Sequence, residues 1–144
     1  MGLALELAQD AARVGEVPVG AIIVRDGHVV CGAANAPITE YDPSAHAEIR
    51  AIREAGRQLG NYRLPGCTLY VSLEPCCMCA GAIIHARLAR VVFAASDPRT
   101  GAAGGCFHIL PHAAHNHHPV VEGGLLAEQS AAILKQFFAR RRKA

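Results

Sequence analysis

Residues 67–95 read CTLYVSLEPCCMCAGAIIHARLARVVFAA, and this segment predicts the centre of the fold. Its ends, Cys67–Leu73 and Arg90–Ala95, are predicted strands, and the residues from about Cys76 to Ala86 form a predicted helix. Two parallel strands need a crossover of this length, whereas a tight turn joins antiparallel ones. A strand, a helix and a strand in this order therefore predict a right-handed parallel crossover.

The N-terminal part predicts a helix followed by a hairpin. Leu3–Val14 carries apolar residues at helical spacing, so it is a predicted helix. The apolar run Val17–Val24 and the segment His28–Ala33 are predicted strands, and the Asp-Gly turn at residues 25–28 joins them.

A second helix is predicted in the middle of the chain. Asp42 or Ser44 is its predicted cap, and the helix is expected to run to about Leu59, where Gly60 closes it. This boundary puts His46 in or near the first turn.

The C-terminal part predicts a turn of helix at Phe107–Leu110, a short fifth strand at Val120–Val121 and a closing helix at Leu125–Arg142. The apolar face of that helix consists of Leu126, Ile133, Leu134, Phe137 and Phe138. With no internal repeat or linker, residues 1–144 are predicted to form a single domain. We expect an α/β fold, a three-layer α/β/α sandwich with a mixed five-stranded sheet and helices on both faces.

Composition excludes several classes of protein. Apolar residues make up 51% of the 144 residues and charged residues 18%, which indicates a globular chain. No apolar run is long enough to span a bilayer, and Glu6 and Asp10 stand where a signal peptide would be basic. Three of the six cysteines lie within four residues, a metal or redox spacing rather than a secreted disulfide framework. We therefore expect a cytoplasmic protein with no membrane partner.

The net charge of +2 is too small to indicate nucleic-acid binding, but the distribution of charge is uneven. Lys135 and the run Arg140–Lys143 lie in the last ten residues, with no acidic residue among them. One interpretation is a solvated helix end, where cations suit the helix dipole. The other is contact with RNA phosphates.

Three residues have the types and spacing of a zinc site. Cys76 and Cys79 share one face of a predicted helix start, where free N–H groups favour thiolates, and His46 supplies an imidazole. Three protein ligands leave one position for water, and zinc lowers the pKa of that water from about 15.7 to about 7. Glu48 is then a proton carrier beside the open position.

Each of these residues also has a simpler interpretation. A lone Cys-x-x-Cys is compatible with a redox pair or with half of a structural zinc site, and a lone His46 with a core residue. The additional Cys77 and the preceding Glu-Pro disfavour a redox pair, and Cys77 is badly directed to be a fourth ligand. The three features together, at two predicted helix starts, favour a zinc enzyme.

The motifs His46-Ala47-Glu48 and Pro75-Cys76-Cys77-Met78-Cys79 fit the pattern of zinc-dependent nucleobase deaminases without gaps. Beyond them, the chain resembles the bacterial tRNA-specific adenosine deaminases over nearly its whole length. The stretches that carry this resemblance are EVPVGA at 16–21, DPSAHAE at 42–48, NYRL at 61–64, LEPC to AGA at 73–82 and TGAAG at 100–104.

The resemblance implies a cytidine deaminase-like fold and a defined activity. Members hydrolyse adenosine to inosine at the wobble position of a tRNA anticodon, as homodimers with one zinc ion per subunit. By resemblance, Glu48 takes the water proton, protonates N1 of adenine and later delivers a proton to the leaving ammonia. Asn35 is implied to hydrogen-bond the flipped nucleotide, and the backbone around Ala47 and around Glu74-Pro75 to line the pocket.

Other residues are predicted with less definite roles. The possible contacts to a tRNA anticodon stem-loop are Asp97, His117, Arg140, Arg141 and Arg142. Cys77 stands where the family leads us to expect an apolar residue and is expected as a free buried thiol. The other free cysteines are expected as small core residues: Cys31, Cys67 and Cys106. The His-rich segment 111–119 is expected to be a solvated loop near the RNA, with a second metal site as the alternative.

Two other functions compete with tRNA editing. The first is a free-base or nucleotide deaminase acting on guanine or cytosine, which uses the same zinc chemistry but needs no phosphate track. The second is an RNA-binding module with structural zinc. Glu48 disfavours this module, because a structural site needs no free carboxylate beside the metal.

Overall fold

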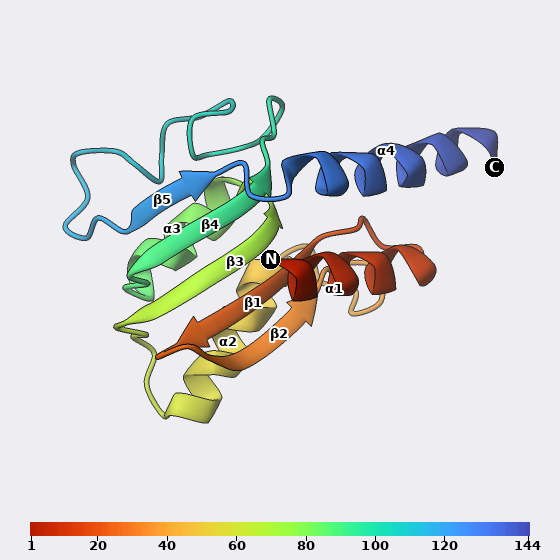
Figure 1. Ribbon diagram of the computed structural model, residues 1–144. Helices are drawn as coiled ribbons and strands as arrows, with labels where there is room; N and C mark the ends of the chain where they lie inside the picture. The colour runs from red at the N-terminus through yellow and green to blue at the C-terminus, as the bar shows by residue number, and fades with distance from the viewer.

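The computed structural model describes residues 1–144 and has four helices packed around one five-stranded sheet (Figure 1). The elements are α1 (Gly2–Arg13), β1 (Gly20–Arg25), β2 (His28–Ala34), α2 (Ala47–Leu59), β3 (Cys67–Leu73), α3 (Cys77–His85), β4 (Arg90–Ala95), β5 (Val120–Gly123) and α4 (Ala127–Lys143). The sheet order is β2-β1-β3-β4-β5. β1 runs antiparallel to β2 and β3, whereas β3, β4 and β5 are parallel. The predicted mixed sheet and parallel crossover are therefore confirmed.

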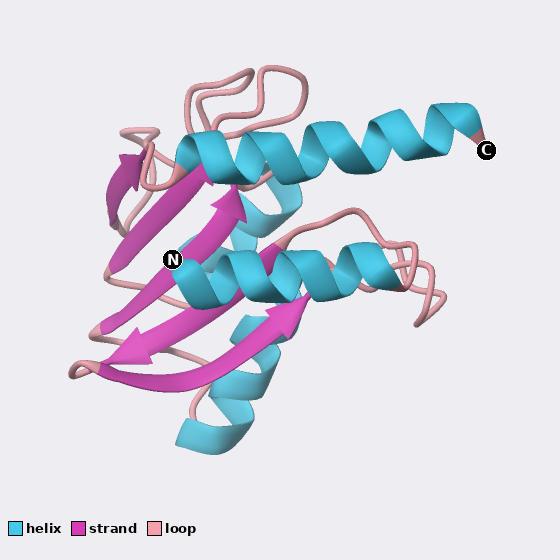
Figure 2. Ribbon diagram, turned by 45° about the vertical axis from the view of Figure 1, so that its right-hand side comes forward, coloured by secondary structure: helices cyan, strands magenta, loops and turns pink.

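Three layers are visible in Figures 1 and 2, with α1 and α4 on one face of the sheet and α2 and α3 on the other. This arrangement confirms the predicted α/β/α sandwich. It also explains why Val91–Ala95 of β4 is a continuous buried run, since helices cover both faces of this central strand. None of the four helices combines the length and apolar character that crossing a bilayer requires.

The N-terminal helix packs directly on the sheet because small residues meet at the contact. Ala4, Ala8 and Ala11 are buried on α1. A Cβ atom at Gly20 would lie 2.0 Å from the Ala4 carbonyl oxygen and 2.8 Å from the Ala8 nitrogen. Any side chain at position 20 would therefore push α1 away from β1.

The second helix begins later than predicted. The Asp42 carboxylate accepts hydrogen bonds from the Ser44 backbone N–H (2.8 Å) and hydroxyl (2.7 Å), so it closes a turn before the helix and does not cap it. The N-cap residue is His46, with φ −69° and ψ 152°. The predicted end is confirmed, because Leu59 is followed by Gly60 in the left-handed region at φ 66°.

Two predictions for the loop after β4 and for the cysteines are wrong. Residues 107–110 form no helical turn, because His108 pairs with Ala103 in an isolated antiparallel bridge. The amides of residues 109 and 110 both donate to the Ala102 carbonyl, which folds the segment back on itself. Cys77 and Cys106 are exposed and not buried, whereas the remaining predicted core cysteines, Cys31 and Cys67, are buried.

Candidate active site

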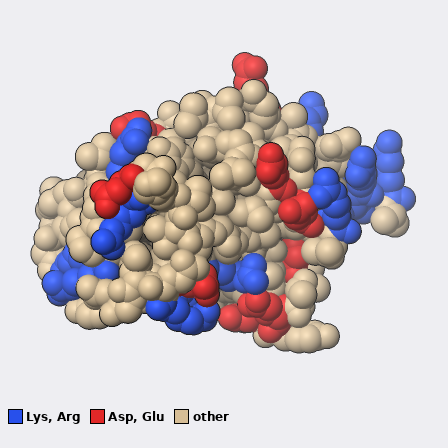
Figure 3. Space-filling view, turned by 60° about the horizontal axis from the view of Figure 1, so that its bottom comes forward, with Lys and Arg blue, Asp and Glu red and all other residues tan.

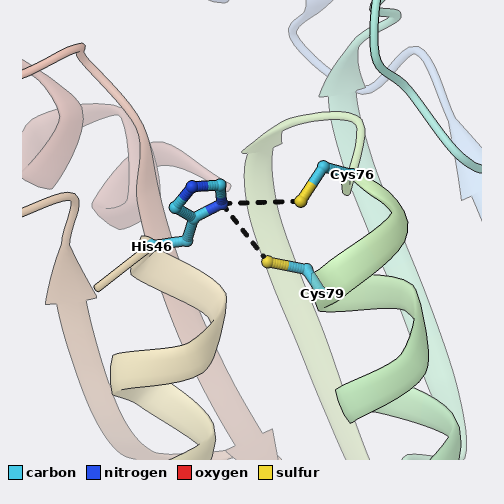
Figure 4. A group of neighbouring side chains, drawn as sticks. All are labelled: His46, Cys76 and Cys79. Carbon is cyan, nitrogen blue, oxygen red and sulfur yellow. Dashed lines mark hydrogen bonds between the residues drawn. The ribbon is translucent and has the colours of Figure 1, made fainter. Parts of the chain in front are cut away.

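Two helix N-termini meet at one edge of the sheet and bring the three predicted metal ligands together (Figure 4). His46 caps α2, Cys76 caps α3, and Cys79 lies in the first turn of α3. Both cap residues have extended backbone, which for Cys76 is φ −76° and ψ 177°. In Figure 4 the His46 ring points toward both sulfur atoms.

The spacing of the donor atoms fits zinc. His46 Nδ1 lies 3.5 Å from Cys76 Sγ and 3.6 Å from Cys79 Sγ, and all three donor atoms lie within 4.8 Å of one another. Tetrahedral zinc, with a Zn–N distance of about 2.0–2.1 Å and a Zn–S distance of about 2.3 Å, needs an N···S separation of about 3.5 Å. The ligand set therefore suits zinc in both donor type and spacing, and it leaves one of four positions for water.

Hydrogen bonds within the ligand set favour a thiolate at Cys76. The Cys79 thiol and the His46 ring together lower the pKa of Cys76 to about 4. The same contact with Cys76 raises the pKa of Cys79, because one of the two sulfur atoms keeps a proton. The hydrogen bond between His46 and Cys76 raises the pKa of His46. A zinc ion displaces these protons, since it binds thiolates and neutral imidazole.

Glu48 lies beside the ligand set and is almost completely buried, with 4% of its surface exposed. Its Oε2 accepts a hydrogen bond from Cys79 Sγ at 3.4 Å. Inside a helix, the spacing of His46 and Glu48 would separate the two side chains, but His46 precedes the first helical residue. Burial raises the pKa of the Glu48 carboxyl, and a raised pKa favours the proton uptake that a proton carrier needs.

A hollow of about 710 Å³ opens beside these residues. Its walls come from the segment before β1, the loop after β2, the loop after β4 and the helix α4. The lining residues are Val17, Val19, Asn35, Pro37, His46, Glu48, Leu73, Glu74, Cys76, Ser96, Asp97, Pro98, Arg99, Thr100, Leu134, Lys135, Phe138 and Arg142. The hollow thus joins a metal-ligand set and a buried carboxylate to three cations, which are Arg99, Lys135 and Arg142.

Comparison with known proteins agrees with this chemistry. Residues 1–95 match the family described as the cytidine and deoxycytidylate deaminase zinc-binding region. A tRNA-specific adenosine deaminase of Haemophilus influenzae is 49% identical over 144 residues, which cover 99% of this chain and 83% of that one. This chain belongs to the tRNA-specific adenosine deaminase family.

Two solved structures place the deaminase among its relatives. One, from biochemical and structural studies of A-to-I editing by tRNA:A34 deaminases, is 45% identical with a TM-score of 0.90, and the match covers 93% of this chain and 97% of that one. A guanine deaminase from Bacillus subtilis is 37% identical with a TM-score of 0.65, over 99% of this chain and 92% of that one. The predicted cytidine deaminase-like fold is therefore confirmed.

Some of the predicted site residues of the deaminase meet in the hollow and some lie outside it. Asn35, Asp97 and Arg142 line it together with His46, Glu48 and Cys76. Ala47 and Pro75 are buried and are not among the lining residues. The Asp97 carboxylate is engaged in its own loop, where it accepts hydrogen bonds from the Arg99 N–H (2.9 Å) and the Thr100 hydroxyl (2.8 Å).

The basic residues of α4 are divided between two hollows. Lys135 and Arg142 line the hollow beside the ligand set, whereas Arg140 and Arg141 line a second one of about 480 Å³ between α1 and α4, with Arg13. Consecutive residues of a helix point in different directions, so a basic run cannot face a single site. Figure 3 shows Lys and Arg gathered at the right-hand end of the molecule, the side on which α4 ends in Figure 1.

The His-rich loop is fixed to the deaminase by its ring nitrogens. His115 Nε2 lies 2.6 Å from the Ile109 carbonyl oxygen, and His117 Nε2 lies 2.7 Å from the Leu88 carbonyl oxygen. The only cluster of three potential metal-binding side chains is that of His46, Cys76 and Cys79, and no histidine of the loop belongs to it. His117, a predicted RNA contact, does not line the hollow.

Several lining residues had no signal in the sequence. Leu134 and Phe138 belong to the predicted apolar face of α4, which gives no indication of a site, yet Phe138 is 41% exposed and both line the hollow. The loop residues Pro98, Arg99 and Thr100 also line it. Their position depends on how the loop folds, which no periodic pattern encodes.

Proposed function

We propose that this deaminase is a zinc-dependent hydrolase that converts adenosine to inosine at the wobble position of a tRNA anticodon. The observation that carries the proposal is the combination found in the larger hollow. A buried Glu48 adjoins a His-Cys-Cys donor set, and Arg99, Lys135 and Arg142 line the same space. The first two features suit hydrolytic deamination, and the cations suit a substrate with a phosphate backbone.

The geometry of the ligand set and Glu48 supports the hydrolytic route that the family resemblance implies. His46, Cys76 and Cys79 would hold the zinc ion, which supplies an activated water at neutral pH. Glu48 would take a proton from that water and deliver it to N1 of adenine. As the water oxygen bonds to C6, the first proton would thus reach N1; Glu48 would then carry the second proton, from the hydroxyl now on C6, to the amino group, which leaves as ammonia when its bond to C6 breaks. This shuttle requires a carboxyl group able to exist in both forms. Burial of Glu48 keeps bulk water from exchanging with the transferred proton.

The adenosine must leave the stacked anticodon loop to reach Glu48, which costs a few kcal/mol. Asn35, which lines the hollow, is proposed to hydrogen-bond the extruded nucleotide. Ala47 and Pro75 do not line the hollow themselves, but the residues on either side of each do, and this backbone is proposed to border the base. Contacts of Lys135 and Arg142 with neighbouring phosphates would offset the cost of extrusion. A tRNA substrate would place the enzyme in the cytoplasm.

The direct test is conversion of an anticodon stem-loop with adenosine at the wobble position, with inosine measured by nuclease digestion and chromatography. We expect complete conversion of the stem-loop and little conversion of free adenosine at the same concentration. The matched control RNA moves the adenosine to a stem base pair, where extrusion also breaks pairing. Absence of inosine from zinc-loaded protein would refute the proposal.

Guanine deaminase activity is the second candidate, because a guanine deaminase shares the fold and 37% identity. The two functions differ in what they require of the cations in the hollow, since free guanine has no phosphate. Incubation of the same protein with guanine distinguishes them. Production of xanthine, with no inosine from the stem-loop, would establish the alternative.

We also propose that the protein acts as a homodimer formed by single-domain subunits. Several large apolar side chains are exposed on the isolated chain, including Tyr41 (95%), Tyr62 (74%) and Met78 (39%). Burial of such side chains favours association. Light scattering at micromolar concentration is expected to give twice the 15.2 kDa chain mass, and a fully active monomer would refute the proposal.

A further inference from the structure

One buried carboxylate has no role in the metal-ligand set. Glu74 follows β3 and is only 3% exposed. Its Oε1 accepts a hydrogen bond from the Asp97 backbone N–H at 3.0 Å. Its Oε2 accepts two more, from the Ala103 and Gly105 backbone N–H groups, each at 2.9 Å. Both oxygens are therefore used to hold the backbone of a single loop, residues 97–105.

The loop is shaped to fit around this carboxylate. A Cβ atom at Gly101 would lie 2.4 Å from Glu74 Oε2, and one at Gly105 would lie 2.4 Å from Glu74 Oε1. The Ala102 N–H also donates to the Pro75 carbonyl at 2.8 Å. The loop is not part of the sheet, so these backbone N–H groups have no strand partner. The Glu74 carboxylate and the Pro75 carbonyl accept their hydrogen bonds instead.

The same loop forms one wall of the hollow proposed to receive the substrate. Ser96 to Thr100 line that hollow together with residues of α4, and Glu74 is itself a lining residue. The zinc ligand Cys76 comes two residues after Glu74. The chain therefore places one carboxylate between the catalytic residues and the wall that borders them.

We propose that Glu74 is a positioning residue: it holds residues 96–100, the wall of the hollow, where they can contact the nucleotides around the target adenosine. The inference rests on the proposed tRNA substrate. Glu74 fixes the Asp97 end of the loop with one oxygen and the Gly105 end with the other. The wall 96–100 supplies none of the three metal-ligand side chains and no hydrogen bond to Glu48, so we expect Glu74 to act on substrate binding and not on the chemical step.

Glu74→Gln tests this role because an amide has one acceptor oxygen where the carboxylate has two. If the amide oxygen keeps the Ala103 and Gly105 bonds, its NH₂ group faces the Asp97 N–H and displaces that end of the wall. We expect KM for the stem-loop to rise about tenfold while kcat stays within about twofold, since the loss falls on binding. Zinc content should stay at one ion per chain.

A matched control is Glu16→Gln, which neutralises another buried carboxylate. Glu16 is 1% exposed, and a single oxygen accepts both of its hydrogen bonds, from the Thr39 N–H (2.7 Å) and hydroxyl (2.9 Å). One amide oxygen can replace it, so KM should change less than about twofold. A second pair perturbs the loop side: Gly105→Ala should reproduce the rise in KM, whereas Gly81→Ala, with no atom within 4 Å of the added Cβ, should not.

The outcomes separate this inference from the proposed function. An unaltered KM for Glu74→Gln, with kcat reduced in proportion to a smaller folded fraction, would make Glu74 a merely structural residue and overturn the inference alone. A parent protein that leaves the stem-loop unconverted would overturn both. A raised KM in Glu74→Gln and Gly105→Ala, with KM preserved in the two controls, supports the positioning role.

Discussion

Glu48 contacts the ligand set without being one of the three ligands. Replacement of a proton carrier and replacement of a metal ligand are expected to have different effects. Glu48→Ala is expected to keep the zinc ion and lose turnover by about 10²–10⁴-fold, because the proton carrier is missing. Elemental analysis and single-turnover inosine formation measure the two effects. Glu54→Ala is the matched control, since Glu54 lies on the same helix and pairs only with Arg57 and Gln58. Loss of zinc from Glu48→Ala would make Glu48 a ligand.

Cys77 and Cys79 provide a comparison between neighbouring thiols. Cys79 Sγ lies 3.6 Å from His46 Nδ1, whereas the Cys77 side chain is exposed. Cys79→Ala is therefore expected to lose the zinc ion and to lower the thermal unfolding temperature, because the ion joins two helix starts. Cys77→Ala should keep one zinc per chain and the parent stability. Equal zinc contents in the two variants would show that the ligand assignment is wrong.

The types of the site residues could be predicted from the sequence, whereas their environments could not. His46, Cys76 and Cys79 have side chains that only a metal or a redox site explains in that spacing. Whether a thiol such as Cys77 or Cys106 is buried depends on which helix face and which loop turn it occupies. Residue type does not determine this, so both were wrongly expected in the interior.

At the scale of elements, the ligands at the starts of two helices hydrogen-bond one another, and the protons in these contacts make zinc binding depend on pH. Without zinc the pKa of Cys76 is lowered to about 4, which favours its thiolate, whereas the contact with Cys76 raises the pKa of Cys79 and keeps its proton; a hydrogen bond with Cys76 also raises the pKa of His46 above its ordinary value. Zinc must displace these protons, so its affinity falls as the pH falls through the pKa of His46. We expect the dissociation constant to rise about tenfold per pH unit for each displaced proton.

Competition with a chromophoric chelator between about pH 5.5 and 8 measures this dependence. The slope should be steeper on the acid side, where the imidazole also binds a proton. Asp97→Asn is a suitable control, since Asp97 is not a ligand and its loop lies outside α2 and α3. A zinc affinity independent of pH would contradict deprotonated ligands.

The division of charges along α4 predicts unequal effects on RNA binding. Replacing Lys135 and Arg142 by Ala removes cations from the larger hollow, and we expect weaker stem-loop binding with a salt slope smaller by about 1–2. The matched control replaces Arg140 and Arg141 by Ala. These two residues line the second hollow, between α1 and α4, and their replacement removes the same amount of charge. Truncation after Phe138 should weaken binding and leave zinc unchanged. A larger effect of the control pair would place the RNA over α1.

Element boundaries were predictable where the backbone itself carries the signal. The Asp26-Gly27 turn has φ of 51° and 76°, and Gly60 has φ of 66°, so sequence and structure agree at both positions. Asp42 and Ser44 misled because their side chains form a complete turn of their own before the helix. An Asp or Ser side chain can hydrogen-bond a nearby backbone amide in a turn as well as in a helix cap, so the residue types do not distinguish the two.

At the scale of the whole molecule, the layers were predictable and the hollows were not. Alternation of strands and helices determines which faces need cover, and the apolar runs of β3 and β4 required cover on both sides. The site depends on long-range contacts instead. Glu74 hydrogen-bonds the backbone of Ala103 and Gly105, which lie 29 and 31 positions further along the chain. No periodic pattern in the sequence indicates such contacts.

The short fifth strand has a consequence for how copies of this chain meet. β5 spans only Val120–Gly123. A Cβ atom at Gly123 would lie 2.4 Å from the Phe93 ring, so this position has no room for a side chain. Gly124, at φ 104°, then turns the chain away. An outer strand this brief offers few free amides to a neighbour. Edge-to-edge pairing, which would continue the sheet from one copy into the next, is therefore disfavoured at this end of the molecule.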